Sequence, residues 1–244
     1  MSHLHIPDGV LPIWLWLAGL LLMVLLLALA LKMAQKANLR RRLPLLGFTS
    51  AVMLIGMSLE VVPIAYHLNL SVLAGILLGP AMGFIAAFVV NFMLALVGHG
   101  GLTVVGLNTL ILGLETFSGY WLFRLLQKPF KPAWAAGTAV FLTLFLTTSL
   151  VIGVVALARL DPLEMGEVSQ GEHSREKGFF SFHREGHHYG KEEQEGGDAK
   201  ATISLTTFAK GAYLLGSIGW LLEALIVGFI VQFLRQVKPE MISS

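Results

Sequence analysis

Residues 9–31, GVLPIWLWLAGLLLMVLLLALAL, form the stretch that decides the fold. These 23 residues carry no charge. A helix needs about 20 mostly apolar residues to cross the hydrocarbon core of a bilayer, so the stretch predicts a membrane span. No Lys or Arg precedes Lys32. A cleavable signal peptide starts with basic residues, so we expect the span to remain in the protein.

The composition extends this interpretation to the whole chain. Of the 244 residues, 55% are hydrophobic and 13% are charged, and the mean hydropathy is +0.74. A soluble domain carries about 25% charged residues. We therefore expect one membrane domain over residues 1–244. The sequence contains no cysteine, so a transition metal here would need nitrogen or oxygen ligands.

The apolar runs predict an all-α, polytopic membrane protein with about seven transmembrane helices. We divide the runs where Pro and Gly interrupt them. The expected helices cover 9–31, 43–66, 68–78, 81–97, 105–126, 133–158 and 201–236.

The basic residues predict the orientation of these helices. Ten of the 17 Lys and Arg residues lie in segments 32–42, 124–131 and 235–238. Because Lys and Arg accumulate in short cytoplasmic loops, we expect these segments in the cytoplasm. The N-terminus then lies outside and the C-terminus lies in the cytoplasm.

Residues 161–200 form a hydrophilic, His- and Glu-rich segment. It holds ten of the 15 carboxylates and shows no apolar periodicity. We expect a disordered loop on the outer side. Its histidines fit either a solvated linker or a weak metal-collecting role; they are His173, His183, His187 and His188.

The other four histidines are His3, His5, His67 and His99, and the predicted topology puts all eight on the outer side. Neutral imidazole binds nickel, cobalt, copper and zinc. A histidine in or near a span needs a partner or a wet cavity, which makes it a functional candidate. The alternatives are a surface position for the early histidines and a backbone hydrogen bond for His67.

The N-terminus offers further nitrogen ligands. A free α-amine, the amides that follow it and an early histidine can surround an ion in one plane, a geometry that suits Ni(II) and Cu(II). With Met1 retained, the amine, two amides and His3 could complete the square. With Met1 removed, a fourth nitrogen is needed, and His67 is a candidate.

Three carboxylates lie in or near predicted spans: Glu60, Glu115 and Glu223. They could line a pore or relay protons, but we favour a role in joining helices. The Gly-rich stretch 100–103 lacks the Lys-Ser/Thr pair of a phosphate-binding loop. The chain therefore has no ATPase signature of its own, and any ATP-driven function would require a partner. We expect no enzyme activity in this chain, and nucleic acid is not an expected partner.

Four segments, met in this order along the chain, resemble the CbiM/NikM family. These proteins are the substrate-specific (S) components of energy-coupling factor transporters, a class of ABC transporter, for cobalt and nickel. The segments are His5-Ile6-Pro7-Asp8-Gly9 with Leu11-Pro12, His67-Leu68 with AGILLGP at 74–80, GHGGLTVVGLN at 98–108, and 223–240 ending in LRQVKPE.

The resemblance implies a function and a set of partners. The chain would capture Ni(II) or Co(II) at the outer face of a prokaryotic inner membrane. A transmembrane coupling (T) component and ATP-binding cassette ATPases would be partners, and a small accessory membrane subunit is a further expected one. ATP hydrolysis would belong to these partners. The cobalt branch of the family feeds cobalamin synthesis and the nickel branch feeds nickel enzymes, and the sequence leaves the metal open.

The resemblance also implies site residues. In the family, the histidine before Ile-Pro-Asp-Gly binds the ion through its side chain and amide, together with the terminal amine. The histidine of the His-Leu motif completes the square. These residues are His5 and His67 here, with Asp8, His99 and Asn108 expected nearby as positioning groups.

The N-terminus departs from the family pattern. Members have Met immediately before the first ligand histidine, whereas this chain has Met-Ser-His-Leu before His5. Three explanations remain open. His3 supplies the early ligand, or His5 binds through its side chain alone, or translation begins at position 4 from a non-AUG codon.

Two other functions compete with the importer subunit. A stand-alone secondary transporter of divalent transition metals would need acidic or histidine residues within its spans. Only three carboxylates lie there, and the histidines gather at one face, which favours the importer subunit. A membrane metal sensor or chaperone is the third alternative, and dependence of uptake on an ATPase separates the first function from both.

Overall fold

The computed structural model describes residues 13–36, 39–58, 60–61, 66–98, 101–159 and 205–242. This part of the chain holds seven α-helices, two strands of two residues and a 3₁₀ turn. The helices are α1 (Ile13–Lys36), α2 (Leu39–Ser58), α3 (Ser71–Leu78), α4 (Pro80–Leu96), α5 (Val105–Leu126), α6 (Pro132–Arg159) and α8 (Leu205–Val237); the strands are β1 (Glu60–Val61) and β2 (Tyr66–His67), and the 3₁₀ turn is η1 (Pro239–Met241). The predicted all-α class is confirmed.

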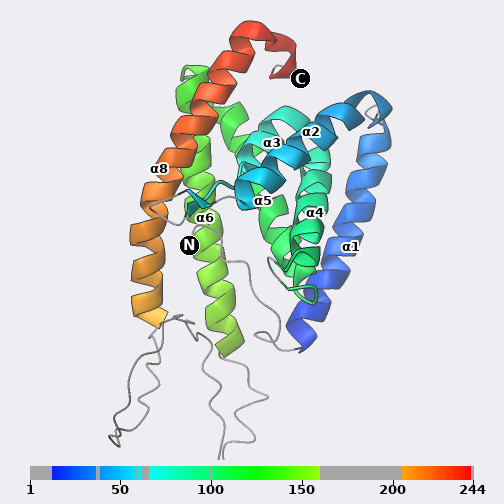
Figure 1. Ribbon diagram of the computed structural model, residues 1–244, viewed down its shortest axis with the longest axis vertical. Helices are drawn as coiled ribbons and strands as arrows, with labels where there is room; N and C mark the ends of the chain where they lie inside the picture. Colours follow the sequence, from blue (N-terminus) through cyan, green and yellow to red (C-terminus); the bar gives the residue numbers. More distant parts are fainter. Residues whose placement is uncertain are drawn as a thin grey trace, which may run out of the picture.

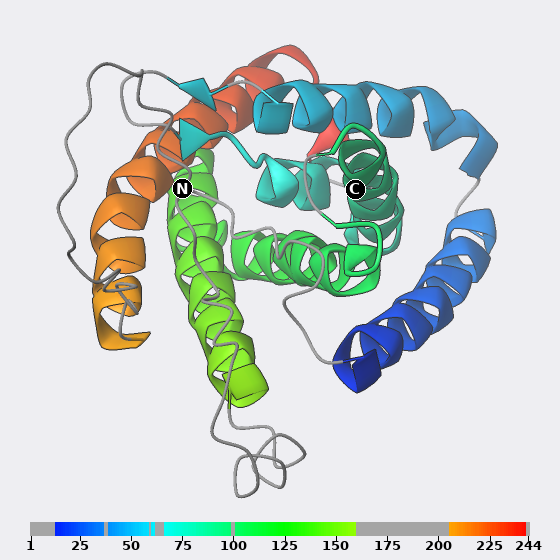
Figure 2. The same ribbon diagram turned by 60° about the horizontal axis from the view of Figure 1, so that its bottom comes forward.

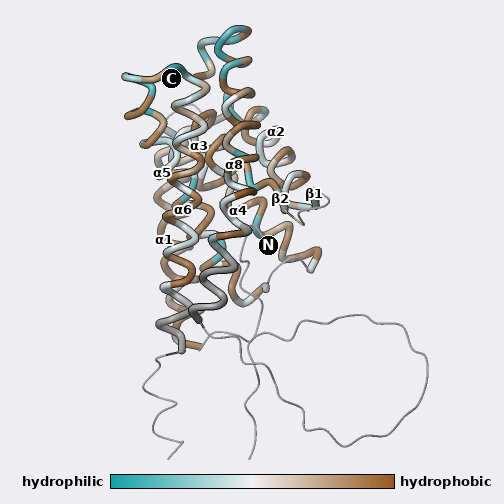
Figure 3. Tube along the Cα trace, turned by 90° about the vertical axis from the view of Figure 1, so that its left-hand side faces the viewer, coloured by the Kyte–Doolittle hydropathy of each residue, from teal (hydrophilic) through white to brown (hydrophobic). Residues whose placement is uncertain are grey.

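Three of the described helices are both long and apolar enough to cross a membrane: Ile13–Gln35 in α1, Pro132–Gly153 in α6 and Gly216–Val237 in α8. Hydrophobic colour runs along the helices in Figure 3, and hydrophilic colour gathers at the end that carries the C-terminus. The chain is therefore a polytopic membrane protein. The eight residues of α3 rise only about 12 Å, too little to cross a hydrocarbon core of about 30 Å.

Helix α5 is the centre of the packing, since it contacts α1, α3, α4 and α6. Helices α6 and α8 pack along each other and form one side of the molecule (Figure 1). In Figure 2, α2 crosses one side of the bundle between α1 and α8, and α3 lies inside. Every residue of α3 is buried, as expected of a helix whose residues after Ser71 are all apolar.

The second predicted span, 43–66, is corrected by the structure. Helix α2 begins earlier, at Leu39, and ends earlier, at Ser58. The chain then forms a small antiparallel pair in which Glu60 lies opposite His67 and Val61 lies opposite Tyr66. Strands of two residues have no periodicity, so the apolar run concealed this change from helix to strand.

The three basic segments used to predict the orientation share one end of the bundle. Figure 1 shows the α1–α2 connection, the α5–α6 connection and the C-terminal end of α8 at the same end. The start of α1 and the α4–α5 connection lie at the other end. The predicted orientation requires these three segments to share one end, as they do. That this end faces the cytoplasm stays a prediction.

Glycines allow the central helices to approach closely. A Cβ added at Gly106 of α5 would lie 2.6 Å from the Cα of Leu20 in α1. A Cβ added at Gly75 of α3 would overlap the carbonyl oxygen of Thr116 in α5. Small residues give membrane helices this close backbone contact, which supplies van der Waals packing where lipid removes the hydrophobic driving force.

We expect Gly75→Ala to destabilise the protein by about 1–3 kcal/mol, because the new methyl group forces α3 away from α5. The measurement is the midpoint of thermal unfolding in detergent. The matched control is Gly47→Ala in α2, where an added Cβ meets nothing within 4 Å. The control keeps or raises the midpoint, since Ala is the better helix former. Equal losses in both variants contradict the packing argument.

Candidate metal centre

Two of the predicted site residues, His67 and Asn108, belong to the part of the chain that the structure describes. His3, His5, Asp8 and His99 lie outside it, as does the 161–200 segment with its four histidines. Among the described residues alone, no group of three or more His, Cys, Asp or Glu side chains could hold a metal ion. The expected early ligands, His3 and His5, lie outside the described ranges.

His67 is the last residue of β2 and is half-buried. The chain leaves it through Leu68, whose N–H donates a hydrogen bond of 3.1 Å to the carbonyl of Gly56 in α2. Asn69 and Leu70 follow, and α3 begins at Ser71. His67 thus lies just before a short helix that the bundle encloses.

The carboxylate of Glu223, in α8, accepts hydrogen bonds from the backbone of the segment that leads into α3. Its side chain is fully buried. Its Oε2 accepts the N–H of Asn69 at 3.2 Å, and its Oε1 accepts the N–H of Leu70 at 2.9 Å. The first N–H groups of a helix have no partner within the helix, and the helix dipole favours a negative group there. Glu223 therefore caps α3 from another helix.

The carboxylate of Glu115, in α5, accepts hydrogen bonds from side chains of the same segment and of α6. Its Oε2 accepts the hydroxyl of Ser71 at 2.7 Å and a hydrogen bond from the Asn69 side-chain amide. Its Oε1 accepts the hydroxyl of Thr147 in α6 at 2.9 Å. Segment 69–71 is thereby joined to α5, α6 and α8 at once.

These contacts lie deep in the protein. Glu223 is near the middle of α8 and Glu115 near the middle of α5. In Figure 1, β2 also lies at mid-height of the bundle. The sequence predicted His67 at the outer face, and this placement relative to the membrane stays a prediction. Non-helical backbone is tolerated inside a membrane protein only where protein or a cavity satisfies it, and Glu223 and the Gly56 carbonyl do so here.

Asn108 is buried near the start of α5. Glu115 follows it by seven residues, so both lie on one face of α5, about 10 Å apart along the axis. Asn91 of α4 donates hydrogen bonds of 3.0 Å to the Val105 carbonyl and to the Thr109 hydroxyl. The first turn of α5, which leads to Asn108, is therefore fixed to α4.

Sequence reasoning missed Asn69, Ser71 and Thr147. It identified Glu115 and Glu223 as carboxylates that join helices, and the structure shows that they do so by holding the start of α3. The available signal was the pair of polar residues Asn69 and Ser71 inside an otherwise apolar run. A polar residue in such a run requires a buried hydrogen-bond partner.

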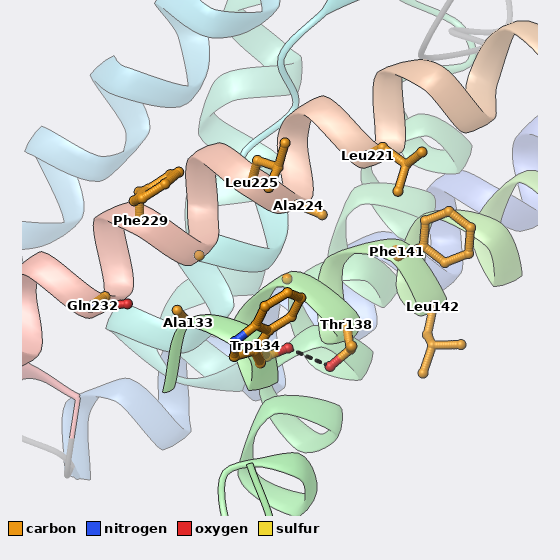
Figure 4. A pocket seen from close by; sticks show the side chains of 12 residues that line it. Ala133, Trp134, Thr138, Phe141, Leu142, Leu221, Ala224, Leu225, Phe229 and Gln232 are labelled. Carbon is orange, nitrogen blue, oxygen red and sulfur yellow. Dashed lines mark hydrogen bonds between the residues drawn. The ribbon is translucent and has the colours of Figure 1, made fainter. Parts of the chain in front are cut away.

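A groove between α6 and α8 does not fit a metal. Its volume is about 500 Å³, and Figure 4 shows that mostly apolar side chains line it, with Thr138 and Gln232 as polar members. The Thr138 hydroxyl donates a hydrogen bond of 2.7 Å to the Trp134 carbonyl, so its hydrogen already has an acceptor. Leu225 and Phe229 at the groove are mostly exposed, as expected of side chains that face lipid.

Comparison with known proteins decides the family. The family model described as the cobalt uptake substrate-specific transmembrane region, CbiM, matches residues 5–241. The chain belongs to the CbiM family. A protein of Halobacterium salinarum named as a cobalt transport protein, CbiM, is 36% identical over 87 residues. That alignment covers 34% of this chain and 40% of the relative.

Two crystal structures share the CbiM fold seen here. One, of a truncated transition metal transporter, has a TM-score of 0.73 at 20% identity, covering 96% of this chain and 99% of the other. The second, of a transition metal transporter, has a TM-score of 0.72 at 20% identity, covering 96% and 93%. The family description, a substrate-specific transmembrane region of cobalt uptake, agrees with the membrane-spanning helices of this chain.

We expect Thr147→Val to lower the free energy of unfolding by about 1.5–3 kcal/mol, because it removes a hydrogen bond to a buried carboxylate. Thermal unfolding in detergent measures the effect. Thr138→Val is the matched control, since the Thr138 hydroxyl bonds only to carbonyls of its own helix and is exposed. If Thr138→Val lowers the free energy of unfolding by the same amount, the hydrogen bond to Glu115 is not the cause.

Proposed function

We propose that this CbiM-family chain is the substrate-capturing subunit of an ATP-driven energy-coupling factor importer for Ni(II) or Co(II). The observation that carries the proposal is the family match over residues 5–241. The match includes both the His5 segment and His67, the two places where the expected nitrogen ligands lie.

The proposed site uses nitrogen ligands from two distant parts of the sequence. His67 supplies an imidazole, and the N-terminal residues supply His5 or His3 with the α-amine and a backbone amide. Asp8, His99 and Asn108 are proposed as positioning groups. Planar nitrogen coordination suits Ni(II), and a cobalt ion with a similar preference also fits. The three explanations for the Met-Ser-His-Leu extension determine which early histidine binds.

The environment of His67 supports this assignment. Its segment is held from α2 through Leu68 and from α8 through Asn69 and Leu70. A ligand on such a constrained backbone loses little freedom when a metal binds. Rigid placement of one ligand is useful where the others come from the end of the chain.

The proposed partners follow from what the chain lacks. Its Gly-rich stretch has no Lys-Ser/Thr pair for phosphate binding. We propose that ATPases of the ATP-binding cassette class, a T component and a small accessory membrane subunit complete the importer. The complex would lie in the inner membrane of a prokaryote and would feed cobalamin synthesis if the metal is cobalt.

The alternative is a stand-alone secondary transporter, which needs acidic groups free to exchange ions or protons within the membrane. Glu115 and Glu223 are the two carboxylates buried in the described helices. Both accept hydrogen bonds that hold the start of α3. Because these structural hydrogen bonds occupy both carboxylates, the importer subunit is favoured over the secondary transporter.

We expect the purified protein, supplied with nickel or cobalt, to hold about one ion per chain, and His67→Ala to lose most of it, because one imidazole is removed from the proposed ligand set. Metal content after desalting measures this. Intact-mass spectrometry of the same sample identifies the first residue and so the early ligand. His173→Ala is the control, since it removes one imidazole from the hydrophilic segment and leaves His67 in place. Equal metal in wild type and His67→Ala contradicts the site.

We expect uptake of nickel or cobalt by cells to require co-expression of the T component and the ATPases. An ATPase variant without its phosphate-loop Lys should abolish uptake while the chain still binds metal. Radioactive metal accumulation measures uptake. Full accumulation by the chain alone would support the secondary transporter.

A further inference from the structure

Two buried carboxylates, Glu115 and Glu223, have no place among the proposed metal ligands. Both nevertheless contact the segment that follows His67. Burying acidic groups at the depth of a membrane is unfavourable unless the protein supplies partners. Their contacts with one short segment indicate that this segment requires exact placement.

We propose that Glu223, assisted by Glu115, is a positioning residue that fixes the backbone from which His67 presents its imidazole to the metal. This inference rests on the proposed function, because it assigns His67 as a ligand. Glu223 itself does not touch the ion in this proposal. It acts through the N–H groups of Asn69 and Leu70.

The backbone next to His67 is constrained from two sides. The Leu68 N–H is bound to α2 at 3.1 Å. The next two N–H groups, of Asn69 and Leu70, are bound to Glu223. Three consecutive peptide groups after His67 therefore have fixed acceptors, which leaves the ligand little room to shift.

Leu70 shows that this segment is held in an unfavourable conformation. Its φ is 57°, in the left-handed region that side chains other than Gly rarely adopt. Such a conformation persists only where the surroundings determine it. The 2.9 Å bond from the Leu70 N–H to Glu223 is one of the interactions that do so. Loss of this acceptor allows the segment to relax and His67 to move with it.

Glu115 holds the same segment by its side chains. It accepts hydrogen bonds from Asn69 and Ser71, and Thr147 fixes its other oxygen. The first residue of α3 is thus bound to α5 while the preceding N–H groups are bound to α8. The two carboxylates together locate the start of α3 relative to three helices.

The substitution E223Q tests the proposal with little change in volume. Glutamine has one acceptor oxygen, and its NH₂ group cannot accept a hydrogen bond. One of the two N–H groups of Asn69 and Leu70 therefore loses its acceptor. The matched control is E240Q, because Glu240 is an exposed carboxylate in η1, away from this segment.

The experiment is a Ni(II) titration of the full chain in detergent, followed by the visible absorption of the bound ion. We expect E223Q to weaken binding about 10- to 100-fold, the effect typical of losing a group that orients a metal ligand. The absorption bands should shift toward those of His67→Ala, since the coordination of the ion changes. E240Q should match the wild type in both readouts.

The double variant H67A/E223Q separates positioning from general stability. If Glu223 acts through His67, E223Q has no further effect on affinity or spectrum in the His67→Ala background. Additive losses, or wild-type binding by E223Q, overturn the inference and leave the proposed function intact. Wild-type binding by His67→Ala overturns both.

Ser71→Ala provides a milder test if E223Q does not fold. It removes one hydroxyl donor from Glu115 and leaves Glu223 in place. We expect a severalfold loss of Ni(II) affinity that is absent in the His67→Ala background. Unchanged affinity in Ser71→Ala, with a folded protein, overturns the proposal.

Discussion

The hydrogen bonds between Glu223 and the N–H groups of Asn69 and Leu70 are the interaction on which the rest of the structure depends. They place the N-terminal end of a short, fully buried helix against the middle of α8. Without a negative group there, the N–H groups of Asn69 and Leu70, just before α3, would lose these acceptors in an apolar interior. Glu115 provides a second attachment, and the packing of α3 against α5 follows from both.

The same interaction explains how irregular backbone exists inside a membrane protein. The strand that ends at His67 and the turn that follows interrupt the helical pattern at mid-height of the bundle. Glu223 of α8 and the Gly56 carbonyl of α2 accept the backbone N–H groups that a continuous helix would have bonded internally. These contacts hold the half-buried His67 within the bundle, at the position where the metal site proposed above would use it.

The sequence was most informative where a single physical property dominates. The uncharged run at 9–31 predicted a first helix, observed at Ile13–Lys36, because length and apolarity alone define a span. The run at 43–66 was misleading, since a two-residue strand pair has no detectable period. His67 could be chosen from the sequence, whereas the link of Asn69 and Thr147 to Glu115 could not, because Glu115 is distant from both in the sequence. Asn108 is located by the structure, and its role at the site stays a prediction.

The contact between Leu70 and Glu223 joins residues that are 153 positions apart. A chain is synthesised from its N-terminus, so the segment after His67 is made long before its acceptor. During that interval α1 to α6 can enter the membrane, but the start of α3 lacks the carboxylate that caps it. Helix α8 therefore completes the interior after α1 to α6 have been made, and the arrangement around His67 forms only once α8 is in place.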